Sequence, residues 1–185
     1  MNRFLGGTIV AMGLLLAGCN PLSSYSVTEQ EINNALAKHE QFSKDIGLPG
    51  IADAHIELSN LTSQIGRQEP GKVTLSGDAK LDFNSLFGNQ KADLKLTLKA
   101  QPAFNAQQGA IYLKEMEVTD AQIEPKKMAS LLQTLMPYLN QSLRNYFNQR
   151  PAYVLSEDRS KGEALAKSQA KGIEVKPGSI VIQFK

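Results

Sequence analysis

Side chains that could support catalysis or metal binding are few in this sequence and stand far apart. The two histidines, His39 and His55, lie on different predicted elements and have no partner at the spacing that metal ligands need. Asp53, His55 and Glu57 share one face of a predicted strand, and a solvated strand face explains them without acid–base chemistry. No serine lies in a nucleophile elbow. We therefore predict no enzyme, no metal site and no cofactor.

Covalent chemistry is assigned to Cys19 alone, the only cysteine of the chain. It follows Arg3 and an uncharged apolar run over residues 4–17, which is typical of a secretory signal peptide. The run is too short to span a bilayer core, which takes about 20 helical residues. Residues 16–19, LAGC, resemble the lipobox of bacterial lipoproteins. We predict that residues 1–18 are cleaved off and that Cys19 carries a lipid anchor of two or three acyl chains.

The residue after the cysteine and the net charge restrict the compartment and the partners. The lipobox resemblance implies a sorting pattern in which an aspartate directly after the cysteine retains a lipoprotein in the inner membrane. This chain has Asn20 at that position. We therefore predict an outer-membrane lipoprotein that faces the periplasm. Loss of residues 1–18 removes Arg3 and leaves 19 basic against 18 acidic residues, a net charge of +1. Nucleic acid is excluded as a partner, because binding it requires a basic stripe.

The mature chain is predicted to form a lipidated tether, residues 19–26, and a single α+β domain, residues 27–185. Its length suits one hydrophobic core. Four stretches alternate apolar and polar side chains and predict strands: residues 52–59, 72–83, 91–99 and 111–118. The fourth changes phase near Lys114 and Glu115, which indicates a β-bulge. Short connections favour an antiparallel meander.

Helical periodicity appears in three places. Thr28 and Glu31 form a capping box that starts a helix ending near Gln41. Residues 125–149 form the longest helix, with apolar side chains over about half its circumference and Pro137 on its polar side. A polar helix over residues 162–171 precedes a hairpin over residues 173–184. The fold class is thus α+β: a long, curved antiparallel sheet wrapped around one long C-terminal amphipathic helix, plus a short N-terminal helix.

The apolar faces of the sheet and the long helix are the predicted ligand site. Small residues on the strands, Ala54, Gly77 and Ala79, leave space that an acyl chain could fill, and methionines offer adaptable packing. The alternative is a closed core with nothing between the two faces. We predict an apolar groove lined by the following groove set: Leu75, Leu81, Leu94, Leu96, Leu98, Leu131, Leu135, Leu139, Leu143 and Phe147.

Charges around the long helix suggest two kinds of partner. The helix contains no acidic residue, and Lys126, Lys127, Arg144 and Arg150 lie in or beside it. These cations could meet the anionic head group of a lipid, although solvated surface charge explains them as well. The alternative function is a non-enzymatic structural or interaction module with a closed core. Such a module would dock an envelope protein complex through an exposed sheet edge or the acid-free helix face.

Several stretches of the chain resemble a known family. They are the lipobox, residues 28–33, residues 42–67 (FSKDIGLPGIADAHIELSNLTSQIGR), residues 113–118, residues 137–155 (PYLNQSLRNYFNQRPAYVL) and residues 172–182. On these the chain is similar to the YceB-like outer-membrane lipoproteins of enteric bacteria. The resemblance implies a fold similar to the tubular lipid-binding superfamily, with an apolar groove between a long sheet and a long helix. It implies no catalytic residue, and it transfers only Cys19 as a functional position.

Overall fold

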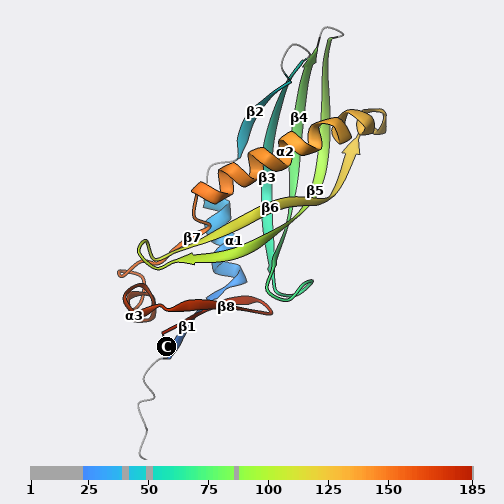
Figure 1. Ribbon diagram of the computed structural model, residues 1–185. Coiled ribbons are helices and arrows are strands. Elements are labelled where there is room, and N and C mark those ends of the chain that lie inside the picture. The colour runs from blue at the N-terminus through green and yellow to red at the C-terminus, as the bar shows by residue number, and fades with distance from the viewer. Residues whose placement is uncertain (1–22, 39–41, 49–51, 86–87, 185) are drawn as a thin grey trace, which may run out of the picture.

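The computed structural model describes residues 23–38, 42–48, 52–85 and 88–184. Its larger sheet is antiparallel, with the strand order β2-β3-β4-β5-β6-β7, so the chain runs through it as the predicted meander. Figure 1 shows that this open sheet curves around the helix α2. The strands are β2 (Ser43–Leu48), β3 (Ala52–Ile65), β4 (Val73–Ser85), β5 (Gly88–Asn105), β6 (Ala110–Glu124) and β7 (Tyr153–Val154).

The alternating pattern of the sequence becomes the two faces of this sheet. In β5 every second side chain from Ala92 to Ala100 is buried. Leu75 of β4 pairs with Leu98 of β5, so apolar side chains of neighbouring strands point to the same side. The four predicted strands are confirmed, and all are longer than predicted.

Three register shifts in β3 and β6 explain why these strands continue beyond the alternating pattern that predicts them, and two of the three are described below. In β3, Ser59 pairs with Asp78 and Thr62 with Ser76, so two residues of β3 stand opposite one of β4 and the buried phase reverses. In β6 the predicted bulge is confirmed, because the pairing of Lys99 and Gln101 shifts there and Glu115 has a φ of 53°. Bulges bend a strand, and both lie in the sheet that curves around α2.

Helix α1 (Glu29–Lys38) begins at the predicted capping box. The backbone N–H of Glu31 donates to Thr28 Oγ1 at 3.2 Å, and the backbone N–H of Thr28 donates to Glu31 Oε2 at 2.7 Å. The helix ends at Lys38, before the predicted end near Gln41, and residues 39–41 lie outside the described residues. Its buried residues Ile32 and Leu36 belong to the apolar core.

Helix α2 (Ala129–Gln149) follows the short 3-10 helix η1 (Lys126–Met128). Together the two helices confirm the helix predicted over residues 125–149. Pro137 lies on its exposed side. In Figure 1 α2 crosses the sheet. Among the described residues, none of the helices combines the length and apolar character needed to cross a membrane. The residues that α2 buries are Leu132, Leu135, Leu139, Leu143 and Phe147.

A second, three-stranded sheet lies at one end of the molecule (Figure 1) and contains β1 (Ser24–Thr28), β9 (Ser179–Gln183) and β8 (Gly172–Lys176) in that order. The predicted C-terminal hairpin is confirmed, and Gly178 takes the positive φ, 81°, that a type II turn requires. The polar helix is also confirmed as α3 (Lys161–Gln169). Buried residues of both sheets form one apolar core.

The sequence did not predict two of the strands. β2 was missed because its described side chains, from Ser43 to Asp45, are polar and exposed and carry no alternating signal. β1 was missed because its partner β9 lies at the other end of the sequence. Residues 24–26 fall within the range predicted as the tether, and the structure places them in β1.

Candidate functional site

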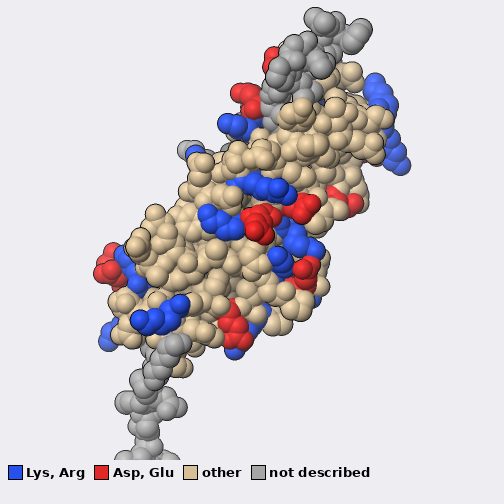
Figure 2. Space-filling model, in the orientation of Figure 1, with Lys and Arg blue, Asp and Glu red and all other residues tan. Residues whose placement is uncertain are grey.

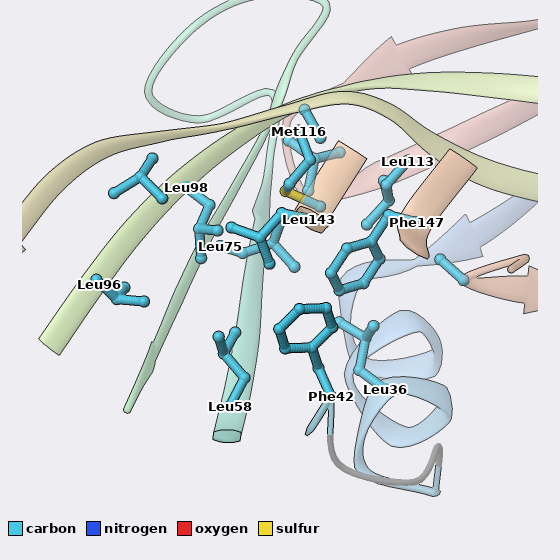
Figure 3. Close-up of a cluster of buried hydrophobic side chains, with 14 of the residues drawn as sticks. Leu36, Phe42, Leu58, Leu75, Leu96, Leu98, Leu113, Met116, Leu143 and Phe147 are labelled. Atoms are coloured by element: carbon cyan, nitrogen blue, oxygen red, sulfur yellow. The ribbon is translucent and has the colours of Figure 1, made fainter. Parts of the chain in front are cut away.

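The groove set lies on the facing sides of the large sheet and α2. Nine of the ten residues are buried and Leu131 is half-buried. Figure 3 shows Leu75 and Leu98 of the sheet beside Leu143 of α2. All ten are part of the apolar core or pack against it. The structure therefore brings the groove set together, with its side chains packed against one another.

An apolar pocket opens beside this core. Its volume is about 220 Å³, and Phe147 is the one groove-set residue in its wall. Ligand pockets for whole small molecules measure about 300–1,000 Å³, so this pocket suits a segment of one acyl chain. The described residues that line it come from α1, the residue before β2, β3, the end of α2 and the segment after it: Leu36, Ala37, Phe42, Leu58, Ser59, Asn60, Leu61, Tyr146, Phe147, Arg150, Pro151 and Ala152.

Three aromatic rings stand where the pocket meets the core. The ring of Tyr146 lies edge-to-face on Phe42, with 4.9 Å between centroids, and on Phe147, with 5.1 Å. Phe42, Leu58 and Phe147 belong both to the pocket wall and to the apolar core. In Figure 3 the rings of Phe42 and Phe147 lie between Leu36 and Leu143.

One source of space inferred from the sequence is wrong. Gly77 does not leave room for a ligand, because a Cβ at this position would lie 2.7 Å from Leu61 Cδ2. Leu61 reaches this position because the β3 bulge places Asn60 and Leu61 opposite Gly77. The missing side chain of Gly77 thus accommodates the bulge.

The four cations considered for a lipid head group are separated by the structure. Lys126 and Lys127 are exposed at η1, at the opposite end of α2 from the pocket. Arg144 donates from Nε to the backbone carbonyl of Met116 at 3.2 Å. Arg150 lines the apolar pocket. Only Arg150 therefore combines a positive charge with a place in the pocket wall.

Ser43, His55 and Asp45 come into hydrogen-bond contact on the outer face of β2 and β3. His55 Nδ1 lies 2.6 Å from Asp45 Oδ1, and His55 Nε2 lies 3.2 Å from Ser43 Oγ. The hydrogen bond to Asp45 raises the pKa of His55. The order resembles a hydrolytic triad, but Asp45 is 87% exposed and Glu57 also approaches Nε2, at 3.4 Å. Water therefore competes for the carboxylate that would orient the histidine, and we assign this cluster to the pairing of the edge strand.

A second polar cluster surrounds the buried carboxylate of Glu163 in α3. Tyr153 Oη donates to it at 3.0 Å, the backbone N–H of Ser156 at 2.7 Å and Arg159 Nη1 at 3.1 Å. Tyr25 of β1 donates its hydroxyl at 3.4 Å. Burial, together with Glu163, raises the pKa of Tyr153. The Glu163 cluster ties β1 to β7 and α3, since its members come from all three parts of the chain.

The sequence does not predict the apolar pocket or which residues line it. Leu36 lies in the predicted N-terminal helix and Leu58 in a predicted strand, but nothing in the sequence joins them to the end of α2. Phe42 follows a predicted helix end with no periodic neighbour. Leu61 lies where the β3 pattern reverses, and that reversal was the one signal that could have indicated a bulge next to the site.

Comparisons with known proteins agree with the resemblance found in the sequence. Residues 27–179 match the family described as "Protein of unknown function (DUF1439)". The chain is 68% identical to the "Uncharacterized lipoprotein YceB" of Escherichia coli (strain K12) over 100% of this chain and 99% of that protein. It is equally similar, at 68% identity and the same coverage, to the protein of that name from Salmonella typhimurium.

Chains of solved structures also match, and one of them aligns over most of this chain. It is described as "Crystal structure of lipopolysaccharide binding protein", with a TM-score of 0.35 and 12% sequence identity. The match covers 88% of this chain and 49% of that chain, so this chain spans about half of that protein. A TM-score of this size does not establish a common fold. The lipoprotein relatives imply that this chain is a membrane-anchored protein of the cell envelope.

Proposed function

The chain belongs to the family described as "Protein of unknown function (DUF1439)" and is a lipoprotein of unknown function, and from this premise we propose that it binds an elongated apolar ligand. The ligand is a phospholipid or a fatty acyl chain, held between the large sheet and α2. The observation that carries the proposal is the pocket of about 220 Å³ whose wall shares Phe147 with the groove set.

The bound chain enters past the three aromatic rings and lies against the groove set. Its binding energy comes from apolar burial, at ~25 cal/mol per Å² before the cost of ordering the chain. The side chains of the groove set pack against one another, so the leucines of α2 and the sheet must shift to admit the full chain. Met116 and Met128 are buried in the same core, and methionine repacks around irregular shapes more readily than branched side chains do.

The proposed membrane anchor is the lipid on Cys19, which lies outside the described residues. The lipobox and the lipoprotein names of the relatives support it. Asn20 supports the outer membrane, with the domain facing the periplasm. Metabolic labelling with an alkyne-bearing fatty acid tests the anchor. The wild-type chain should take up the label and remain with outer-membrane vesicles, and the variant Cys19→Ser should do neither. Label retained by Cys19→Ser would contradict the anchor.

Ligand binding is tested by native mass spectrometry and lipid extraction of the anchor-free domain, residues 20–185, purified from the periplasm without detergent. The expected result is one lipid or fatty acid per chain. Ala37 is an exposed residue of α1 in the pocket wall, so Ala37→Trp fills the pocket without disturbing the core. This variant should lose the lipid. Ala129→Trp, also at an exposed helix position but outside the pocket, is the matched control and should keep it. A mass that stays that of the bare protein after incubation with envelope lipids would refute the proposal.

A second candidate function is a docking module with a closed core. It is favoured by the outer face of α2, where the sequence from Ala129 to Leu143 contains no charged residue and Tyr138 is 44% exposed. Figure 2 shows a broad uncharged surface along this helix. A photo-reactive amino acid at position 138 would cross-link to one defined envelope protein if this face docks a partner. Such a cross-link in a protein that carries no lipid would favour the docking module.

A further inference from the structure

The apolar pocket has a single formal charge in its described lining, and this charge is Arg150. Arg150 is the C-cap residue of α2, and its backbone N–H donates to the carbonyl of Tyr146 at 3.2 Å. Its guanidinium lies over the ring of Tyr146, 4.6 Å from the centroid, and Nη1 donates to the Tyr146 hydroxyl at 3.3 Å. The aromatic ring therefore holds the cation at the pocket wall.

Arg150 differs from two other arginines of the described chain. Arg67 pairs with Glu29 at 3.0 Å, and Arg159 pairs with Glu163 at 3.1 Å. No ion pair within the described ranges joins Arg150 to a carboxylate, and no acidic side chain lines the pocket. A guanidinium has five N–H donors, and the contacts found in the described residues use one. Arg150 thus has both charge and donors available for a ligand.

A cation in this position also stabilises the C-terminal end of a helix through the helix dipole, with no ligand involved. That contribution accounts for an arginine at the end of α2. It does not account for the position of the guanidinium in the wall of an apolar pocket. An experiment that compares ligands of equal length and different charge separates the two roles, because the dipole contribution is the same for every ligand.

We propose that the pocket selects a single-chain amphiphile with an anionic head group, and that the guanidinium of Arg150 binds this head group. The inference rests on the proposed function, since the acyl chain occupies the same pocket. A carboxylate or a phosphate can accept two parallel N–H bonds from a guanidinium, which a hydroxyl or an ammonium head group cannot do. The apolar residues of the pocket wall then cover the first part of the chain.

The test measures the affinity of the full mature chain for four ligands of one chain length: dodecanoate, dodecyl phosphate, dodecanol and dodecyltrimethylammonium. Titration calorimetry at low salt should show the two anions binding about tenfold more tightly than dodecanol, with the cation weakest. The relative affinity of dodecanoate and dodecyl phosphate distinguishes a fatty acid from a phosphate-bearing lipid as the source of the head group. High salt should reduce the preference for anions.

Variants of two arginines test whether the preference for anionic ligands comes from Arg150. Arg150→Met should make dodecanoate and dodecanol bind about equally, and Arg150→Lys should keep part of the preference because the charge remains. Arg144→Met is the matched control, an arginine of the same helix outside this pocket, and should bind like the wild type. If Arg150→Met does not fold, the charge series and salt dependence of the wild type still decide the question.

The outcomes separate the inference from the proposed function. If dodecanol binds and the anions bind no more tightly, the role of Arg150 is refuted and the acyl-chain site stands. An anion preference that survives in Arg150→Met also refutes it. If none of the four ligands binds, the proposed function itself fails.

Discussion

The apolar pocket and the Glu163 cluster are held together by different forces. The pocket side relies on rings and aliphatic side chains, whose contacts are non-directional. The Glu163 side relies on hydrogen bonds with fixed geometry around a carboxylate that is only 2% exposed. A non-directional core can repack around a guest, whereas a hydrogen-bonded buried charge cannot move without losing its partners. The molecule thus has an adaptable middle and a fixed end, and β1 leads into the fixed end from the predicted anchor.

The largest expected effect is that of Leu143→Ala in the adaptable middle. Leu143 is fully buried between α2 and the sheet, so its truncation leaves a cavity and should lower the free energy of unfolding by about 4 kcal/mol. Urea denaturation measures this loss. Because an acyl chain can fill the cavity, dodecanoate should restore more stability to this variant than it adds to the wild type. Equal gains in both proteins would contradict an adaptable core.

Glu163→Ala should have the next largest effect, a loss of about 3 kcal/mol, because Tyr153 and the N–H of Ser156 lose their acceptor. The control is Glu174→Ala, which removes an exposed carboxylate paired with Lys176 at 3.5 Å and should cost less than about 1 kcal/mol. Dodecanoate should stabilise Glu163→Ala and the wild type by the same amount. If Glu163→Ala lowers the free energy of unfolding no more than Glu174→Ala does, the Glu163 cluster does not fix this end of the molecule.

Gly77→Ala tests whether the space above this glycine is occupied. The added Cβ would meet Leu61 Cδ2 at 2.7 Å, and we expect a loss of about 1 kcal/mol as Leu61 shifts. The companion variant Leu61→Ala should make Gly77→Ala harmless, which a double-mutant cycle in urea measures. If Gly77→Ala has no effect in the wild-type background, the space was open after all.

The smallest expected effect is the pH dependence of stability that comes from His55, beside the edge strand β2. The pKa of His55 is raised in the folded chain by its hydrogen bond to Asp45. The stabilisation is therefore complete below the unfolded pKa of about 6.5 and disappears as the pH rises through the higher folded pKa. Both side chains are exposed, so we expect less than about 1 kcal/mol. The variant Asp45→Asn should reduce this pH dependence of urea unfolding, and the remainder should come from Glu57, which lies 3.4 Å from His55 Nε2 and also raises the pKa of His55. An unchanged pH profile would contradict the assignment.

The sequence predicted the helices and strands that have a periodic pattern of apolar side chains, and it predicted little of how separate segments meet. The capping box at Thr28, the bulge at Glu115 and the buried face of α2 were all local patterns, and the structure confirms them. The pocket depends on Phe42, Leu61 and Arg150, which lie on three segments far apart in the chain. Their proximity results from the β3 bulge and from the way α2 crosses the sheet, and no pattern within one segment encodes it.

A fatty acid that carries a photo-reactive diazirine near the end of its chain tests whether an acyl chain lies between the sheet and α2. After irradiation, mass spectrometry of peptides locates the attachment. We expect label on Phe42, Leu58 or Phe147 and, deeper in the core, on Leu143, and we expect Ala37→Trp to lose all of it. Label confined to the exposed face of α2 around Tyr138, and unchanged in Ala37→Trp, would show that no acyl chain enters between the sheet and α2.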